Sequence, residues 1–243
     1  MRKPVITFDC DGVFADFTKM FTGLVNSKFG TEYTPEWPAY DAAAIMSREH
    51  WDSGWELVKA TPYFWMLLES YPDVPFKKLG AMLFEGVFTS YVVSLRVVGD
   101  DVDPALQTRL WLNDKGLTHL QGVIVGNQNR PALLTMLGSD AHLDDSGAHV
   151  VDLRKAGINA YLLDRTWNQD AAVDPAYRVY SIDQFLEDVV STFLPAEVNK
   201  TFFSPPQIAD LVTLPNLWSA EQSAHLLRES GFQFYKLAEA SRA

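Results

Sequence analysis

Three carboxylates stand close together near the start of the chain, directly after an apolar run. They are Asp9, Asp11 and Asp16, within the stretch VITFDCDGVFADF that covers residues 5–17. Like charges this close raise each other's cost of ionisation, so a cationic partner is expected beside them. The stretch by itself therefore predicts a metal site, and other elements of the fold must supply its remaining groups.

Several short apolar runs are typical of buried parallel strands. They are VITF (5–8), VFTSYVVS (87–94), GVIV (122–125), AHL (141–143) and AYLL (160–163). Helical patterns lie between the later runs. Residues 103–116 have Pro104 near their start and Gly116 at their end, which is the usual asymmetry of helix signals. Residues 130–137 and 148–157 are predicted helices of the same kind.

This alternation of strands and helices indicates right-handed βαβ units and an α/β fold with a doubly wound parallel sheet. In such sheets, ligands bind outside the carboxyl ends of the strands. Asp9, Ser94 and Asp145 all follow predicted strands at these ends. We therefore expect these three side chains to lie close together.

The composition is that of an ordinary globular protein: of 243 residues, 47% are hydrophobic and 21% charged. The net charge of −11 argues against binding to polymeric nucleic acid or an anionic membrane, because both need clustered Lys and Arg. The only cysteine is Cys10, so no intrachain disulfide can form and a reducing compartment fits best. No apolar run approaches the roughly 20 residues needed to span a bilayer. The N-terminus has acidic residues where a signal peptide stays apolar, and we expect a cytoplasmic protein.

The pattern predicts a core, an insert and an extension. Residues 1–16 and 87–193 form the core, and residues 17–86 form a helical cap inserted after the first strand. The insert lacks a convincing strand and contains helical patterns, one of which Ser47 can cap. Residues 194–243 form a C-terminal helical extension. This extension either packs on the core or contacts a partner such as a second copy, and the sequence does not decide between the two.

The run DCDGVFADF, residues 9–17, resembles the first motif of the haloacid dehalogenase (HAD) superfamily of phosphohydrolases, an Asp-x-Asp-Gly after a strand. Its part DGVFADF is most similar to the 5′(3′)-deoxyribonucleotidase branch. The resemblance covers about residues 4–190. It implies a HAD-like (Rossmannoid) core with a helical cap and the activity of a Mg²⁺-dependent phosphomonoesterase.

The resemblance gives the residues of the first motif distinct roles, and their chemistry agrees. Asp9, at the strand tip, is the expected nucleophile that attacks phosphorus and forms an aspartyl-phosphate. Asp11 is expected to protonate the leaving oxygen and then to deprotonate the attacking water. Gly12 leaves room for backbone amides to approach phosphate oxygens. Asp16 is expected to be structural and to cap the helix that follows.

The second and third motifs supply phosphate contacts. Ser94, the last residue of the strand YVVS, is expected to donate its hydroxyl to a phosphoryl oxygen. Arg96 matches the Arg of a Thr-Ser-Arg run common in the nucleotidase branch and is expected to bind substrate. The third motif is a Lys in most of the family, whereas the best match in VGNQNRPALL is Arg130. An Arg keeps the charge and can grip phosphate with two nitrogens.

The fourth motif is an acidic pair, which the run AHLDDSGAHVV supplies as Asp144 and Asp145. The alignment of DDS makes Asp145 the expected direct metal ligand, with Asp144 holding waters or a basic neighbour. Together with Asp9 and the backbone carbonyl of Asp11, this is the sparse oxygen set that Mg²⁺ accepts. The cation also reduces the repulsion between an anionic nucleophile and an anionic substrate.

The predicted cap is rich in aromatic residues, and similar rings line the base pocket in deoxyribonucleotidases. The segment TPYFWMLLESYPDV makes Phe64 and Trp65 the expected base contacts. The expected reaction is the hydrolysis of a (deoxy)nucleoside monophosphate to nucleoside and phosphate. Two alternatives stay open: a HAD phosphatase for another small phosphate ester, in which the rings form only a cap core, and a non-catalytic protein that binds a phospho-ligand or a partner. The sequence does not fix base or sugar preference.

Overall fold

The computed structural model of the protein describes residues 2–99, 102–126 and 129–194. Its centre is a parallel sheet with the strand order β3-β2-β1-β4-β5-β6. The strands are β1 (Val5–Phe8), β2 (Thr89–Ser94), β3 (Gly122–Val125), β4 (Ala141–Asp144), β5 (Ala160–Leu163) and β6 (Arg178–Val179). This arrangement confirms the predicted α/β class and adds β6, which is too short to leave an apolar run in the sequence.

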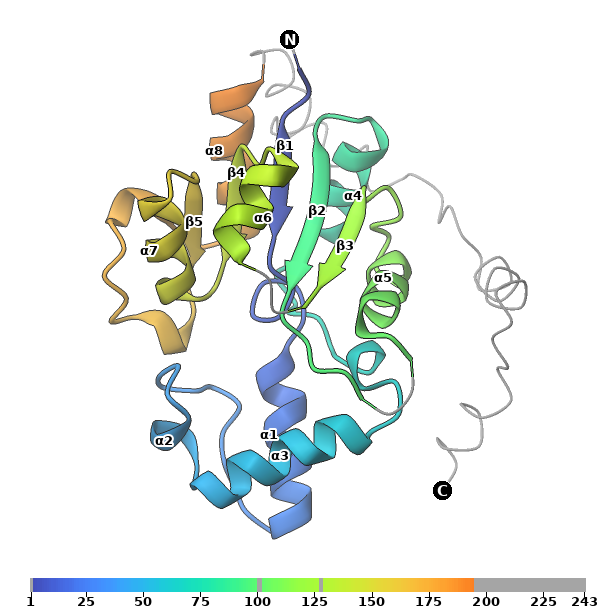
Figure 1. The fold of residues 1–243 in the computed structure, drawn as a ribbon, viewed down its shortest axis with the longest axis vertical. Coiled ribbons are helices and arrows are strands. Elements are labelled where there is room, and N and C mark those ends of the chain that lie inside the picture. The colour runs from blue at the N-terminus through green and yellow to red at the C-terminus, as the bar shows by residue number, and fades with distance from the viewer. Residues whose placement is uncertain (1, 100–101, 127–128, 195–243) are drawn as a thin grey trace, which may run out of the picture.

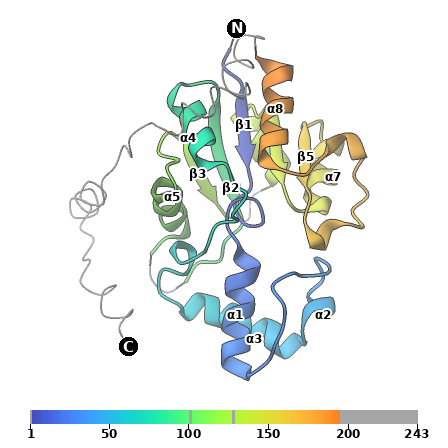
Figure 2. The same cartoon turned by 180° about the vertical axis from the view of Figure 1, so that it is seen from behind.

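Helices cover both faces of the sheet (Figures 1 and 2). On one face, α6 (Arg130–Leu137) and α7 (Gly147–Lys155) bury their apolar residues against β2 and β5. On the other face, the main core joins α4 (Phe76–Phe84), α5 (Pro104–Asp114) and α8 (Ile182–Phe193) to β1 and β2. The central strand β1 is thus enclosed on both sides, which explains why its side chains read as one apolar run.

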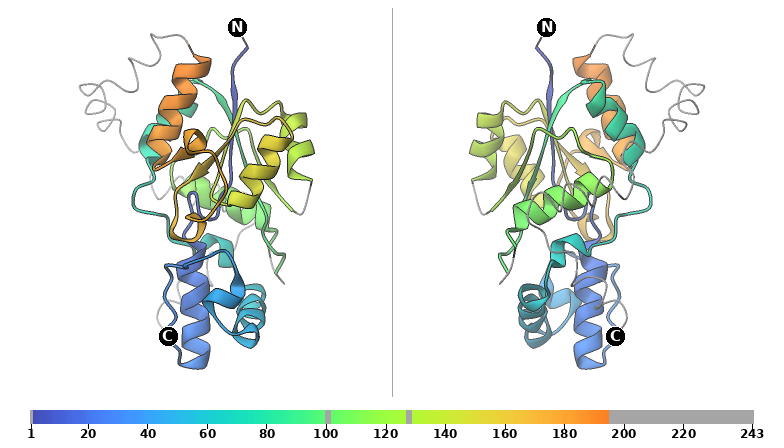
Figure 3. Two further views of the ribbon diagram at one scale, coloured as in Figure 1. Left: turned by 90° about the vertical axis from the view of Figure 1, so that its left-hand side faces the viewer. Right: turned by 90° about the vertical axis from the view of Figure 1, so that its right-hand side faces the viewer.

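A second group of helices lies beyond the carboxyl ends of the strands, toward which the arrows in Figure 1 point. It consists of α1 (Phe17–Phe29), α2 (Ala42–Ile45) and α3 (Arg48–Ala60), and the side views in Figure 3 show it as a separate layer under the sheet. The side chain of Asp16 accepts the Lys19 N–H at 3.1 Å at the start of α1, as predicted. The Ser47 hydroxyl oxygen likewise accepts the His50 N–H at 3.3 Å.

The segment predicted as a single cap over residues 17–86 has two parts in the structure. Helices α1 to α3 lie beyond the strand ends, whereas α4 packs beside the sheet (Figure 2). The buried residues Leu79 and Met82 of α4 belong to the main core with Trp111 of α5. This placement favours a cap that ends before α4. The predicted extension 194–243 lies, apart from Leu194, outside the described residues.

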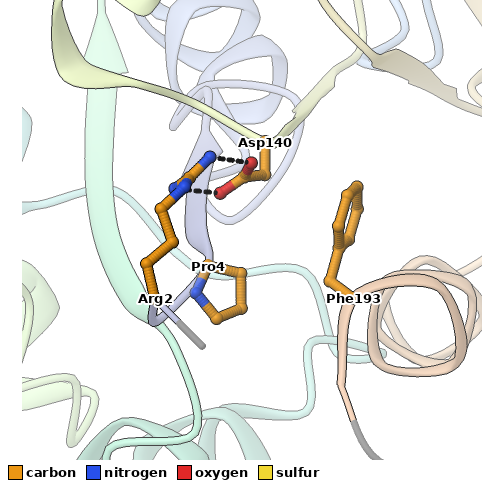
Figure 4. Close-up of a pocket in the computed structure, with 4 residues that line it drawn as sticks. All are labelled: Arg2, Pro4, Asp140 and Phe193. Atoms are coloured by element: carbon orange, nitrogen blue, oxygen red, sulfur yellow. Dashed lines mark hydrogen bonds and ion pairs between the residues drawn. The ribbon is translucent and has the colours of Figure 1, made fainter.

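A small pocket lies at the amino ends of the strands, between the N-terminal segment and the end of α8 (Figure 4). It is lined by Arg2, Pro4, Asp140 and Phe193. The two nitrogens of the Arg2 guanidinium donate to Asp140 at 2.8 and 2.5 Å, and Asp140 also accepts the Val5 N–H at 2.8 Å. These contacts attach the first residues to the strand ends. In the described residues, no helix has the length and apolar character needed to cross a membrane.

Candidate active site

The sheet order brings the predicted site residues together because β1 lies between β2 and β4. Phe8, the last residue of β1, is in register with Val92 of β2 and with Leu143 of β4, so the three strands end within two residues of one another. Asp9 continues β1 by one residue and donates its N–H to the Leu143 carbonyl at 2.8 Å. Asp9, Ser94 and Asp145 therefore leave the sheet side by side, as the sequence predicts.

The Asp9 carboxylate is buried, with only 7% of the residue exposed. One oxygen accepts the Cys10 N–H at 2.7 Å, and the other lies 3.2 Å from Nη1 of Arg130. Burial raises the pKa of Asp9 above its usual value, and the charges of Asp144 and Asp11 add to this against the attraction of Arg130. A further cation would favour the ionised form that a nucleophile needs.

Asp11 is held from the side of β2 by two residues. The Arg96 guanidinium donates through Nε to Oδ2 at 3.0 Å and through Nη2 to Oδ1 at 2.6 Å. The Ser94 hydroxyl donates to Oδ2 at 3.3 Å. The side chain of Asp11 keeps 20% of its surface exposed, whereas that of Arg96 has none. In this structure Arg96, expected to bind substrate, therefore contacts the predicted general acid.

Gly12 is placed where no other residue fits. Its φ of +77° lies in the left-handed region, and a Cβ added to it would meet the Asp145 carboxylate at 2.3 Å. Its carbonyl accepts the Nε–H of Arg165 at 2.7 Å. Arg165 was not predicted as a site residue, because no sequence pattern shows that a residue after β5 contacts this loop.

Arg130 begins α6 and inserts its guanidinium among three other groups. Its Nη1 contacts Oδ2 of Asp144 in a short ion pair, Oδ2 of Asp9 at 3.2 Å and Nδ1 of His149 at 3.1 Å. The ligand atoms of Asp9, Asp144 and His149 lie within 4.8 Å of one another, close enough to hold a metal ion. The same guanidinium nitrogen touches all three, so in this structure the cation among them is Arg130.

Asp144 is fully buried as the partner of this cation. Burial opposes its ionisation, but the Arg130 charge and the hydrogen bonds with His142 and His149 outweigh burial and hold the pKa of Asp144 well below its usual range. This fits the expectation that Asp144 holds a basic neighbour. His149 was not predicted, and its position on the first turn of α7, five residues after Asp144, is the only sequence signal for it.

The environment of Asp145 raises its pKa, whereas that of Asp144 lowers it. Its Oδ2 accepts the indole N–H of Trp167 at 2.8 Å, and its backbone carbonyl accepts from Asn168 at 2.8 Å. Its Oδ1 is buried and has no hydrogen-bond partner among the described residues. Burial and the charges of Asp144 and Asp9 raise the pKa of Asp145 well above its usual value. An unpartnered buried carboxylate oxygen packed against Gly12 fits a cation ligand, and Asp145, Asp9 and the Asp11 carbonyl offer the oxygen atoms that Mg²⁺ prefers.

The aromatic residues of the cap form a packed cluster. Phe64 is 2% exposed and Trp65 is 3% exposed. The Trp65 ring stacks on Phe17 with centroids 6.0 Å apart, and Phe64 meets Trp65 edge to face at 4.9 Å. Rings this buried stabilise the cap but offer little surface to a base. Their stacking role thus stays a prediction, and this structure does not favour it.

One exposed cap residue has its phenol near the carboxylates. Tyr40 precedes α2 and is 61% exposed. The charge of Asp145, together with the charges of Asp144 and Asp9, raises the pKa of Tyr40. Tyr40 was not predicted as a site residue, because only the fold brings the segment before α2 close to the strand ends.

The parallel sheet with helices on both faces defines an α/β protein whose candidate site lies at the carboxyl ends of the strands. Two solved structures share the fold: a candidate phosphoglycolate phosphatase from Lactobacillus delbrueckii subsp. bulgaricus (TM-score 0.54) and a predicted phosphoglycolate phosphatase from Haemophilus somnus (TM-score 0.52). Each is 14% identical to this chain and aligns over 78% of this chain and 99% of its own. Likeness at this level of identity shows the fold alone.

Within this class, residues 3–191 match the family described as 5′ nucleotidase, deoxy (Pyrimidine), cytosolic type C protein. The match spans most of the chain, and the protein belongs to this family of phosphoric monoester hydrolases. The resemblance seen in DCDGVFADF is thereby confirmed. No curated protein matches the chain in sequence comparison.

Proposed function

We propose that the protein is a Mg²⁺-dependent phosphatase that hydrolyses (deoxy)nucleoside monophosphates through an aspartyl-phosphate on Asp9. The observation that carries the proposal is the convergence of Asp9, Asp11, Ser94, Arg130 and Asp145 beyond the carboxyl ends of four adjacent strands, β3, β2, β1 and β4. Family membership supports the nucleotide as substrate.

In the first step, an oxygen of Asp9 attacks phosphorus and the bond to the leaving oxygen breaks. Arg130, 3.2 Å from Asp9, can turn its remaining N–H groups to phosphoryl oxygens while Asp144 holds its other side. Asp11 delivers a proton to the leaving oxygen. The Ser94 hydroxyl, which donates to Asp11 at 3.3 Å in this structure, and the backbone at Gly12 would contact the phosphoryl oxygens.

In the second step, Asp11 takes a proton from the water that attacks the phosphoryl group on Asp9, and phosphate leaves. Bound Mg²⁺ would neutralise part of the charge that the phosphoryl group and the carboxylates bring together. Asp9, Asp145 and the Asp11 carbonyl would hold it. The raised pKa values of Asp9 and Asp145 support this, since a bound cation favours the ionised form of both carboxyls.

A phosphatase for another small phosphate ester is the second candidate. The burial of Phe64 and Trp65 favours it, because it removes the two rings expected to stack on a base. Both candidates use the same site and differ only in what the cap contacts.

A phosphate-release screen separates the two candidates. Nucleoside monophosphates, deoxynucleoside monophosphates and sugar phosphates are compared at equal concentration with Mg²⁺ and with a chelator. The proposal expects Mg²⁺-dependent release with a preference for nucleotides. Equal turnover of sugar phosphates and nucleotides would favour the second candidate, and an Asp9→Asn variant as active as the wild type would remove both.

A further inference from the structure

We propose that Arg96 is a positioning residue whose guanidinium sets the orientation of Asp11, the general acid of the reaction. The inference rests on the proposed function and deepens it, because it assigns Arg96 to the acid and not to the substrate. Arg96 follows β2 by two residues, and its side chain is fully buried.

The hydrogen-bonding capacity of Arg96 is taken up almost entirely by the protein. A guanidinium has five N–H donors. Two of them bind Asp11, one donates from Nη2 to Cys10 Sγ at 3.2 Å, and one donates from Nη1 to Thr108 Oγ1 at 2.7 Å. A buried group with this set of partners has little left to offer a substrate.

The guanidinium is also fixed on the sides that face away from Asp11. Thr108 donates its own proton to the Pro104 carbonyl at 2.6 Å, so its oxygen is free to accept from Arg96. The guanidinium carbon lies 4.7 Å from the centroid of the Trp65 ring. Trp65 in turn donates its indole N–H to the Val97 carbonyl at 3.1 Å. Helix α5 and the cap thus hold the plane of the Arg96 fork.

The Asp11 carboxylate is held by Arg96 on one side and is partly exposed to solvent on the other. Arg96 contacts both of its oxygens, while a fifth of its side-chain surface stays exposed. A planar fork that contacts both carboxylate oxygens fixes the plane of the carboxyl group, which one Lys nitrogen cannot do. The geometry therefore directs the exposed side of Asp11 toward the place where the leaving oxygen departs.

The step that depends on this orientation is the cleavage of the ester bond. As the bond from Asp9 to phosphorus forms, the bond from phosphorus to the ester oxygen breaks and its electron pair stays on that oxygen. The proton of the Asp11 carboxyl group moves to the same oxygen. An alkyl leaving group needs this proton, whereas p-nitrophenolate is stable enough to leave without it.

The test compares two substrates with different leaving groups and no nucleobase. For wild type and Arg96→Lys, kcat/KM is measured with glycerol 2-phosphate and with p-nitrophenyl phosphate, since this ratio reports the steps up to ester cleavage. We expect a loss of about 10²-fold or more with glycerol 2-phosphate, the low end of what a general acid contributes, and only a few-fold loss with p-nitrophenyl phosphate. Asp11→Asn serves as the benchmark and should show the same selectivity.

Two further variants keep the result interpretable. Thr108→Val removes one anchor of the fork at nearly constant shape and should show the same selectivity more weakly, even if Arg96→Lys folds poorly. Arg109→Lys is the matched control, because Arg109 lies next to Thr108 on α5 and donates to the Leu120 carbonyl, away from the site. It should leave the ratio between the two substrates unchanged.

Equal losses with both substrates, or a change confined to KM, would overturn the positioning role and favour a structural or substrate-binding one. The same holds if Arg96→Lys lowers the rate of the Asp11→Asn protein as much as it lowers that of the wild type. Failure of the proposed function gives a different result, because then the wild type itself would hydrolyse neither substrate.

Discussion

The replacement Gly12→Ala tests how tightly the first loop fits against the acidic pair. Gly12 has a φ of +77°, and an added Cβ would lie 2.3 Å from Cγ of Asp145. Gly157→Ala is the matched control: Gly157 has a φ of +81°, and nothing lies within 4 Å of an added Cβ. Both variants carry the backbone strain, and only Gly12→Ala carries the steric clash.

The expected magnitudes follow from these distances. The strain of an alanine in the left-handed region costs about 1–2 kcal/mol, and both variants should lose this much unfolding free energy. Carbon atoms in contact are separated by about 3.5 Å, so Asp145 or the loop must move by about 1.2 Å, the difference between 3.5 and 2.3 Å. A displacement of about 1 Å at a reacting centre can cost about 10²-fold in rate.

The assay is urea unfolding of both variants together with kcat/KM for p-nitrophenyl phosphate at saturating Mg²⁺. We expect the clash to make Gly12→Ala less stable than Gly157→Ala by about 1–3 kcal/mol. We also expect full activity in Gly157→Ala and a loss of about 10²-fold in Gly12→Ala. If Gly12→Ala and Gly157→Ala are equally active, the close packing of Gly12 on Asp145 does not matter for catalysis and the reasoning is refuted.

Three further predictions concern the charged groups of the site. Arg130→Met should cost about 3–5 kcal/mol of unfolding free energy in urea, because it leaves the buried Asp144 without its cation. Arg130→Lys should restore most of this loss. Equal stability of the two variants would contradict the pairing of Arg130 with Asp144. The hydrogen bond with Asp144 raises the pKa of His149. The wild type should therefore be more stable than His149→Gln by its full margin below about pH 6.5, and this margin should decline as the pH rises above that value. A margin that grows with pH would contradict the raised pKa. Burial and two carboxylates raise the pKa of Asp145, so in the presence of a chelator the wild type should lose stability relative to Asp145→Asn as the pH rises above about 4. Mg²⁺ should raise the melting temperature of the wild type only. A Mg²⁺-induced rise in the melting temperature of the variant would argue against Asp145 as a ligand.

The sequence was informative about the site where residues follow strands directly. Asp9, Ser94 and Asp145 come within one residue of the ends of β1, β2 and β4, and parallel strands place their carboxyl ends at one edge. The motif spacing therefore determined which groups meet. Asp16 could also be predicted as a helix cap from the sequence, because a capping residue contacts only the first turn of the helix that follows it.

The contacts that orient these groups depend on the fold and left no local signal. Arg96 binds Asp11 across 85 positions of the chain, and Arg165 reaches the Gly12 carbonyl across 153. Nothing in the sequence around Arg96 separates a residue that holds a carboxylate from one that holds a substrate. His149 is a similar case, because its contact with Arg130 requires α6 and α7 to lie on the same face of the sheet.

The aromatic residues of the cap illustrate a different limit. Phe64 and Trp65 stand in a segment rich in aromatic residues, and composition alone cannot tell a stacking surface from a small core. The structure packs both rings against other aromatic residues and leaves them 2% and 3% exposed. Helix α4 was predicted as part of the cap for a related reason: it follows the cap helices in sequence, although it packs on the core.

The central claim is that Asp9 attacks phosphorus, and it can be tested by trapping the intermediate. Wild type and Asp9→Asn are mixed with p-nitrophenyl phosphate and Mg²⁺, quenched in acid within one turnover and digested for mass spectrometry. The account predicts a phosphorylated Asp9 in the wild-type peptide, with formation kinetics that match nitrophenolate release, and neither signal in Asp9→Asn. Turnover in the wild type without phosphate on Asp9, together with an active Asp9→Asn, would contradict it.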